Sequence, residues 1–453
     1  MSPQSKSNKA ILFMQCTGLN DSIETTDQTY TAEGVTDLRD CLNVTVTPSG
    51  KLVKINQLSQ VLAVADTVDI SAGTDMFVTA GTVLKKFDGT NLVTLTGTPT
   101  FNNSKGKFIH TPIDSRFEVA AVDPYVSKNG TTTAAACALG TYAGPQTFKS
   151  FSRMQDFDFG FVFSGRLFTV KGKFLQFSEK YNYDVFNVAD DYFGFKDEIL
   201  QAGQIPGCII LMHKDSITTL VGSDVGNFIK TTHACRPLVG TLWSGTATKV
   251  VEDVHVFTCA DGIHIVGADG KLANLSVERT DRLDRLNTVY NTAIVTVDGK
   301  YLAYGDSCCI EYDFVVKSVL IRNTQSILAS CRHKGEDYFA TPTGIYRQSG
   351  TMDATSICTV ALPYNDFGNA LTKHIRYIYF TGELTGAAEF ITRNQFGGAV
   401  THQVNNLGYV QNHKIGSFRT CRGNKLSVEI NVTDGRFKLE ELTASYTMCS
   451  SRL

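Results

Sequence analysis

Short strand–turn–strand units recur along most of the chain, and this repeat constrains its fold more than any other feature. Residues 76–84 (MFVTAGTVL) and 256–265 (VFTCADGIHI) are two clear copies, each with a short apolar strand on either side of a turn. Turns of this kind fall at Gly81, Pro124, Gly172, Asp215, Gly262, Gly305 and Gly344, 39 to 48 residues apart. A period of about 40–50 residues with several strands per unit is typical of a β-propeller, whose blades bury their faces against each other. Seven turns predict six to eight blades.

The strand pattern predicts an all-β protein. Apolar residues alternate with polar ones in segments such as 156–163 and 426–432, which is the pattern of half-buried strands. Helical spacing occurs only at 280–294, where we expect one helix. The single tryptophan, Trp243, excludes the repeated Trp-Asp dipeptide of WD40 blades, and the Gly-Gly doublet of kelch blades is not repeated either.

The repeat ends near residue 371, and this divides the chain into three predicted parts. Residues 1–32 are expected to form an N-terminal arm. Residues 33–371 are expected to form the propeller-like domain, with a loop insertion near 127–150, where a run of Thr and Ala is found. Alternating segments separated by Gly-Gly and Asp-Gly turns predict a C-terminal antiparallel β-sandwich at 372–453.

Charge and composition exclude several classes of protein. The chain has 453 residues, 19% of them charged, and a net charge of −2, which does not suit a nucleic-acid coat or a polybasic membrane anchor. Residues 373–453 carry ten Lys or Arg against six Asp or Glu, so this part is at +4 and the rest at −6. No apolar run approaches the ~18–20 residues of a membrane span, and we expect no secretion signal.

Motifs for covalent chemistry are missing from the sequence. It contains no G-x-S-x-G, H-E-x-x-H, G-x-x-x-x-G-K-[ST] or G-x-G-x-x-G pattern, so we predict that the protein is not an enzyme and has no catalytic or cofactor-binding residues. The triplet Gly305-Asp306-Ser307 resembles part of an esterase motif, but its place in the repeat favours a hairpin turn.

Metal binding is an alternative that the sequence leaves open but does not favour. The 12 cysteines form no C-x-x-C pair, and we expect them to be reduced and mostly buried. Cys235 lies near four histidines that could gather around a metal: His213, His233, His255 and His264. Histidines at alternating strand positions are more often packed side chains, so we predict no metal site.

Two groups of residues are candidates for contacts between subunits or with a partner. Phe157, Phe159 and Phe161 share one face of a predicted strand, which is either a core strand or an exposed apolar patch. Asp190 and Asp191 belong to an acidic stretch with interspersed aromatics, which fits a solvated loop edge, a calcium loop or a carbohydrate-binding rim.

Several segments resemble the propeller-type tail hub or nozzle proteins of short-tailed bacteriophages. Residues 38–52 (LRDCLNVTVTPSGKL) are similar to the segment with which these proteins enter the first blade, although Val53-Lys54-Ile55 stands where the family has Arg-Arg-Pro-Gly. Shorter similarities are found at 165–170 (GRLFTV), 175–179 (LQFSE), 183–186 (YDVF), 205–222, 261–263 and 375–384. The resemblance therefore extends over nearly the whole chain.

The resemblance implies a structural role in the virion tail, with assembly in the host cytoplasm and no cofactor. Such proteins form a homo-oligomeric ring, usually a hexamer, that continues the DNA channel below the portal and adaptor proteins and contacts tail fibres or a needle. Genomic DNA would pass through the lumen without sequence-specific binding, and a net charge near −2 suits a passage because each neutralised phosphate adds affinity.

Two other functions stay open at this point. One is a propeller enzyme acting on glycans or phosphodiesters, with acidic loop residues such as Asp190 and Asp191 as its candidate site. The other is a monomeric receptor-binding module. Turnover by the isolated protein would support the first, and ligand binding by a monomer without ring assembly would support the second.

Overall fold

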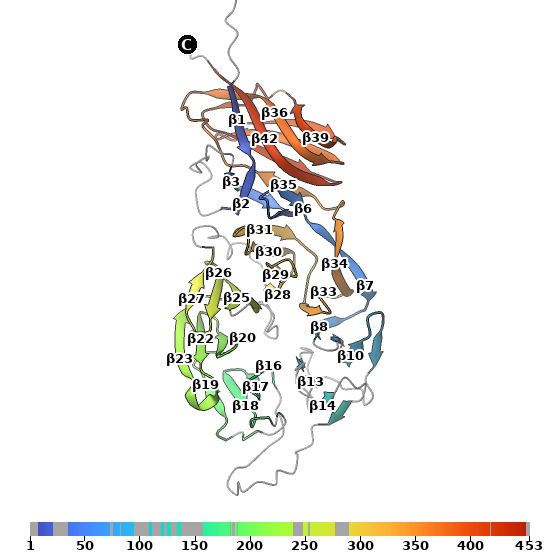
Figure 1. The fold of residues 1–453 in the computed structure, drawn as a ribbon, viewed down its shortest axis with the longest axis vertical. Coiled ribbons are helices and arrows are strands. Elements are labelled where there is room, and N and C mark those ends of the chain that lie inside the picture. Colours follow the sequence, from blue (N-terminus) through green and yellow to red (C-terminus); the bar gives the residue numbers. More distant parts are fainter. Residues whose placement is uncertain are drawn as a thin grey trace, which may run out of the picture.

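The protein is a ring of β-sheets with a β-sandwich attached at its rim (Figure 1). The computed structural model describes residues 8–20, 35–72, 76–81, 83–94, 108–110, 119–121, 125–127, 134–136, 157–181, 183, 186–187, 189–238, 248–251, 254–276, 290–416 and 418–449. Within these ranges all regular elements are strands except one 3-10 turn, η1 (Val225–Asn227). No helix of the described residues is long and apolar enough to span a bilayer.

Seven four-stranded antiparallel sheets form the blades of the ring over the described residues, each written here from its innermost strand outwards. Blade 1 consists of β8 (Thr67–Ala72), β9 (Met76–Ala80), β10 (Val83–Phe87) and β11 (Leu92–Thr94). Blade 2 consists of β12 (Phe108–His110), β13 (Val119–Ala121), β14 (Tyr125–Ser127) and β15 (Ala134–Ala136). Blade 3 consists of β16 (Phe159–Phe163), β17 (Arg166–Lys171), β18 (Phe174–Phe177) and β19 (Tyr192–Gly194).

The remaining blades follow the same order. Blade 4 consists of β20 (Gln201–Ile205), β21 (Cys208–Met212), β22 (Ser216–Val221) and β23 (Ile229–Ala234). Blade 5 consists of β24 (Thr248–Val251), β25 (Val254–Cys259), β26 (Gly262–Gly267) and β27 (Leu272–Asn274). Blade 6 consists of β28 (Tyr290–Val295), β29 (Lys300–Gly305), β30 (Cys308–Asp313) and β31 (Ser318–Asn323). Blade 7 consists of β32 (Ala329–His333), β33 (Glu336–Thr341), β34 (Gly344–Met352) and β7 (Asn56–Ala63).

The ring is closed by strands from its two ends. In blade 7 the outermost strand β7 comes from the beginning of the propeller and pairs antiparallel with β34, which comes from its end. The innermost strands contact one another in sequence around the ring, and β32 of blade 7 contacts β8 of blade 1. Closure leaves no end blade with an uncovered face, so only the short outer edges of the blades remain free.

The seven sequence turns mark the seven blades. Each belongs to the hairpin that joins the second and third strands of one blade, so the prediction of a β-propeller with six to eight blades is confirmed. The turn residue Pro124 itself lies outside the described residues, as does most of the insertion near 127–150. The helix expected at 280–294 is wrong at its C-terminal end, where residues 290–295 form β28, and residues 277–289 lie outside the described ranges.

Two sheets make up the sandwich. One contains β39 (Gly408–Ile415), β36 (Lys373–Leu384), β42 (Phe437–Met448), β6 (Leu52–Lys54) and β5 (Val44–Val46), with β1 (Asn8–Phe13) on β42 and β40 (Arg422–Gly423) on β36. The other contains β38 (Ala399–Asn405), β37 (Ala387–Asn394), β41 (Leu426–Val432), β35 (Cys358–Ala361) and β4 (Asp40–Leu42). A short parallel pair, β2 (Gln15–Leu19) and β3 (Val35–Leu38), connects β1 to them.

This strand pairing differs from the predicted division at residues 33 and 371. Strands β4, β5 and β6 pair with the C-terminal sheets rather than with a blade, and β1 lies in the segment expected to be an arm. The physical reason is edge protection. Strands β41 and β42 would each present an unpaired edge, and β35 and the N-terminal strands cover those edges.

Apolar cores lie between successive blades and between the sandwich sheets. One cluster joins blades 3 and 4 through Phe168 and Leu220, for example, and another joins blades 5 and 6 through Val256 and Tyr312. The largest cluster fills the sandwich and includes Leu320 of blade 6. The sandwich core therefore continues onto the propeller.

Strand β31 is where the sandwich meets the propeller. Outermost strands are usually the exposed edges of blades, and in β23 five of six residues are exposed. In β31 four of six residues are buried, because the segment around Asn43 covers it. The Asn43 backbone N–H donates to the Ile321 carbonyl (3.1 Å), and the Asn43 side-chain oxygen accepts from the Asn323 N–H (2.7 Å).

A buried charge cluster, which we call the joint, lies under this contact. Glu311 is fully buried, lies 2.9 Å from the Lys300 ammonium, and pairs with Arg322. Asp313 lies 3.5 Å from the same ammonium and balances the second positive charge. From β5 of the sandwich, Thr45 donates to Glu311 (2.6 Å) and accepts from Lys300. Blade and sandwich therefore share one hydrogen-bonded network.

Replacing Glu311 with Ala is expected to lower the free energy of unfolding by about 3–5 kcal/mol, because it leaves buried cations without their carboxylate. Urea denaturation measures the loss. The control is Glu336→Ala, which breaks an exposed pair with Arg347 and is expected to cost about 0–1 kcal/mol. Equal losses in the two variants would contradict the role of the joint.

A second prediction concerns pH and Glu429 in β41. Burial acts to raise the pKa of this carboxyl, but hydrogen bonds from Arg393 and Asn431 and the nearby charge of Arg39 outweigh it, so the pKa is lowered. A carboxyl with a lowered folded pKa stabilises the fold above its unfolded pKa, and the contribution is lost as the pH falls through the folded value. The stability difference between the wild type and Glu429→Gln should therefore be largest near neutral pH and shrink below about pH 4.5. Urea titrations at several pH values measure this difference. A difference that does not change with pH would refute the lowered pKa of Glu429.

Candidate functional site

The phenylalanine stripe is part of the propeller core. Phe157 is fully buried and Phe159 is nearly so. Phe161 is half-buried and stacks on the ring of Phe168 at 5.5 Å between centroids. Strand β16 is the innermost strand of blade 3 and contacts the innermost strands of both neighbouring blades. Of the two interpretations of the stripe, this burial favours the core strand, and a subunit or partner contact at these residues stays a prediction.

The acidic pair lies in a turn that leads into β19. The backbone N–H groups of Asp190 and Asp191 both donate to the carbonyl of Asn187, at 3.1 and 2.8 Å. The Asn187 side chain in turn donates to the Asp190 carboxylate at 3.2 Å. Asp190 is exposed at the outer edge of blade 3. A partner contact at this turn stays a prediction.

Three of the histidines named from the sequence have separate structural roles. His213 lies 2.9 Å from the Glu198 carbonyl and 3.2 Å from the Thr218 hydroxyl. His233 donates to the Gly270 carbonyl at 3.1 Å. His255 packs against Gly203, where any side chain would collide with its ring.

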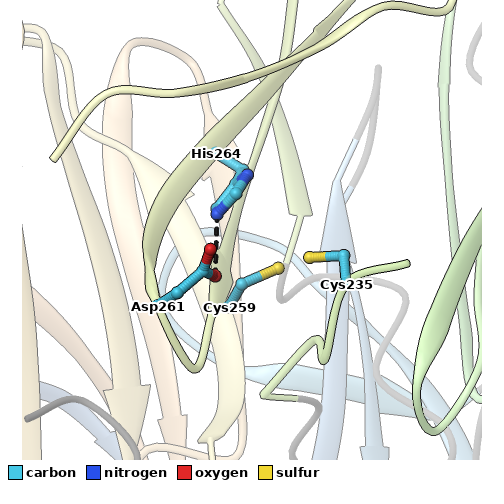
Figure 2. Close-up of side chains that lie close together, drawn as sticks. All are labelled: Cys235, Cys259, Asp261 and His264. Atoms are coloured by element: carbon cyan, nitrogen blue, oxygen red, sulfur yellow. Dashed lines mark hydrogen bonds and ion pairs between the residues drawn. The ribbon is translucent and has the colours of Figure 1, made fainter. Parts of the chain in front are cut away.

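The fourth histidine belongs to a cluster of potential metal ligands (Figure 2). The donor atoms of Cys235, Cys259, Asp261 and His264 all lie within 4.8 Å of one another. We call this group the thiol–imidazole cluster. Cys235 and His264 were candidates from the sequence, whereas Cys259 and Asp261 were not considered as ligands there.

The hairpin of β25 and β26 places three of the four ligands. Its register pairs Cys259 with Gly262 and Phe257 with His264, so the Cys259 and His264 side chains lie diagonally on the same sheet face. Asp261 sits in the two-residue turn between the strands, and its carbonyl accepts from the Asn274 side chain at 2.9 Å.

His264 is held in place on two sides. Its ring stacks on Phe257 with centroids 5.8 Å apart, and its Nε2 lies 2.9 Å from the Asp261 carboxylate. The side chain is only 6% exposed. Among the described residues its Nδ1 has no hydrogen-bond partner. The imidazole is therefore fixed in orientation but not fully satisfied.

Cys235 comes from the connection between blades 4 and 5, directly after β23. This connection lies along the end of β25: the Leu238 N–H donates to the Thr258 carbonyl (3.1 Å), and the Ala260 N–H donates to the Arg236 carbonyl (2.9 Å). Pro237 forms a β-bridge with Cys259. Both cysteines are free thiols, and burial, together with Cys235 and Asp261, raises the pKa of Cys259.

Two kinds of chemistry suit the cluster. Two sulfurs, one imidazole and one carboxylate match the ligands of a thiophilic divalent cation. Two adjacent thiols could instead be oxidised to a disulfide. The signal that could have revealed the cluster is the spacing C-x-D-x-x-H across a two-residue hairpin turn, which brings the three side chains to one end of the hairpin.

The strand pairing defines the class of the protein: a seven-bladed β-propeller, counted over the described residues, with an attached β-sandwich. No protein-family model matches the sequence, and a search of curated proteins finds no match.

Solved structures similar to this chain include a β-propeller domain, all at low sequence identity. The WD40 β-propeller domain of Doa1 is 13% identical, with a TM-score of 0.41, over 65% of this chain and 98% of that one. YCF48 bound to D1 peptide is 9% identical, with a TM-score of 0.39, over 70% and 100%. The extracellular domain of the one-component system BT4673 from B. thetaiotaomicron is 11% identical, with a TM-score of 0.42, over 79% of this chain and 47% of that one.

The hairpin that carries the cluster should depend on Gly262. Its φ of +139° is a conformation that favours glycine, and an added Cβ would lie 2.3 Å from the Ser276 hydroxyl. Gly262→Ala is expected to destabilise the fold by more than about 1 kcal/mol in urea denaturation. The control is Gly172→Ala at the equivalent turn of blade 3, where φ is +56° and the added atom meets nothing within 4 Å. A larger loss at Gly172 would contradict this reading.

Proposed function

We propose that this protein is a structural subunit of a phage tail, a nozzle or hub. Copies would form a ring that extends the DNA ejection channel below the portal and adaptor and docks fibre or needle proteins. The resemblance implies that the ring is a hexamer. The observation that carries the proposal concerns residues 38–52. The segment that most resembles the tail proteins is also the segment that fastens the sandwich to the propeller.

The contacts of this segment support a mechanical role. Asn43 has a positive φ of 55° and makes four hydrogen bonds: two with β31, one to the Ile357 carbonyl just before β35, and one from the Ile55 N–H after β6. Arg39 pairs with Glu429 at 3.5 Å. Thr45 enters the buried joint. A segment with this many fixed contacts keeps the two lobes in one relative position, as a subunit of a rigid channel requires.

The end of the sandwich farthest from the propeller is a candidate contact surface. Strand β36 runs from this end towards the propeller. Its first residue, Lys373, pairs with Met448, and its last residue, Leu384, pairs with Phe437, next to the residues of β42 that pair with β6. Twelve extended residues separate these ends by roughly 36 Å. The far end, which we call the distal end, carries Phe396, 80% exposed, and the basic residues Arg376, Lys414, Arg419 and Arg422.

The basic residues of the distal end lie close together. Lys414 lies 3.7 Å from the centre of the Tyr377 ring, and the pKa of Tyr377 is lowered by a hydrogen bond from Arg376 and by the charge of Lys414. The Arg422 carbonyl accepts from the Asn394 side chain, which also holds the turn that presents Phe396. An exposed aromatic ring at the same end of the sandwich as these cations is a suitable anchor for an acidic surface.

The charge distribution supports assembly from head to tail. Residues 373–453 are at +4, and the rest of the chain is at −6. A basic distal end that contacts the acidic body of the next copy is a heterologous interface, and such interfaces form rings when the rotation closes. Because the contact is electrostatic at its periphery, assembly should weaken as salt rises.

Imaging of the purified protein tests the proposal. We expect rings at low ionic strength in negative-stain electron microscopy, a matching mass in analytical ultracentrifugation, and the protein in purified virions. The triple variant Phe396→Ser/Arg419→Glu/Arg422→Glu should remain folded. The protein concentration at which rings form should rise more than tenfold, since a hot-spot residue contributes about 2 kcal/mol or more to binding.

The matched control is Val315→Ser, which removes a side chain 71% exposed in blade 6 and should leave assembly unchanged. A stable monomer that is absent from virions would contradict the proposal. Turnover of glycans that is lost in an Asp190→Ala/Asp191→Ala variant would support an enzyme instead, and receptor binding by a monomer would support a receptor-binding module.

A further inference from the structure

We propose that Cys235, Cys259, Asp261 and His264 bind one zinc ion, which cross-links the blade 4–blade 5 connection to the hairpin of blade 5. This site is independent of the assembly proposed above, because it lies within one protomer and needs no partner. The argument rests on the donor atoms, their spacing, and the segments from which they come.

The donor set favours zinc. Structural zinc sites are tetrahedral and use Cys, His and carboxylate ligands, whereas calcium and magnesium require six or more oxygen ligands. Ligand atoms around a tetrahedral zinc ion lie roughly 3–4 Å apart, given bonds of about 2.0–2.3 Å. The four donors lie within 4.8 Å of one another, which is close to this spacing. His264 and Asp261, now 2.9 Å apart, would turn from each other toward the ion.

The burial of the ligands gives the site an inner and an outer side. Cys259 and His264 are buried, Cys235 is half-buried, and the Asp261 side chain is 67% exposed. An ion can therefore reach the thiols from the side of Asp261. Once bound, it would be enclosed by the two sulfurs and the imidazole, and the carboxylate would face solvent.

Binding releases protons in a defined number. Both cysteines must lose their thiol protons to form two zinc–sulfur bonds, and the two protons pass to solvent. The neutral imidazole binds through Nε2, and the carboxylate contributes a third negative charge against the two positive charges of zinc. Affinity should therefore fall as the pH falls, since protons compete for the same sulfurs.

The site would strengthen a weakly covered part of the ring. Cys235 follows β23, the outermost strand with five exposed residues, and the connection after it is attached to blade 5 by the Pro237 bridge and by the backbone hydrogen bonds of Leu238 and Arg236. A metal bond from Cys235 to Cys259 and His264 would join blade 4 to blade 5 at this point. Removing the ion should then loosen the connection without opening the sandwich.

The first experiment measures metal in tag-free protein purified under reducing conditions. We expect about one zinc per chain by inductively coupled plasma mass spectrometry, because the four ligands form one tetrahedral site. Cys235→Ser and His264→Gln should each lower the zinc content severalfold. The control is Cys449→Ser: Cys449 lies 3.5 Å from His374 and forms a single cysteine–histidine pair in the sandwich, so its loss should leave the zinc content unchanged.

Two further measurements keep the proposal testable if a variant fails to fold. Asp261→Asn alters only the exposed ligand. It should lower the affinity for zinc, measured by competition with a chelator, while the circular dichroism spectrum stays unchanged. Cobalt added to apoprotein should give a thiolate charge-transfer band that decreases in Cys235→Ser. Removal of zinc with a chelator should lower the melting temperature of the wild type, but not that of Cys235→Ser.

Several results would overturn the proposal. The first is protein that binds no zinc after zinc is added. The second is a zinc content that is unchanged in Cys235→Ser and His264→Gln. The third is a Cys235–Cys259 disulfide found by peptide mass spectrometry in protein kept reduced. The failure of ring assembly would leave the zinc result untouched, and the reverse also holds.

Discussion

The burial of one outermost strand, β31, determines how the two lobes of this protein are held together. Its position over the Lys300–Glu311–Arg322 cluster means that the sandwich covers charged groups that would otherwise sit half-solvated at the rim. Buried ion pairs add little net stability compared with apolar packing, but an unmatched charge there is costly. The joint therefore specifies the docking position: any other placement of Thr45 would leave Glu311 and Lys300 without one of their partners.

The need to cover unpaired strand edges explains the course of the N-terminal chain. It first adds β1 to the sandwich, then completes both sheets with β4, β5 and β6, and finally closes the ring as β7. Each of these strands covers an edge that would otherwise be open to pairing with another molecule. The chain can close both lobes because its beginning and end meet at the sandwich, so the order of strands in space differs from the order in sequence.

The sequence analysis considered two of the four cluster residues, Cys235 and His264, but favoured packed side chains over a metal site, and it missed the other two for a definable reason. Cys259 and Asp261 were overlooked because their role depends on hairpin register, which puts Cys259 diagonally beside His264, and on a connection that turns back along β25. The phenylalanine stripe was ambiguous for a related reason: period-2 patterns identify a strand face but do not show whether a neighbouring blade covers it.

By itself, the sequence determined the all-β class, the period, and the turns that mark the seven blades, because turn residues and alternation act locally and repeat with each blade. The tertiary structure alone decided which edges pair, and it assigned β4, β5 and β6 to the sandwich instead of the ring. It also decided which charges are buried at the joint and which four side chains meet between blades 4 and 5. These contacts join residues up to several hundred positions apart, and no local pattern in the chain encodes the meeting of such distant segments.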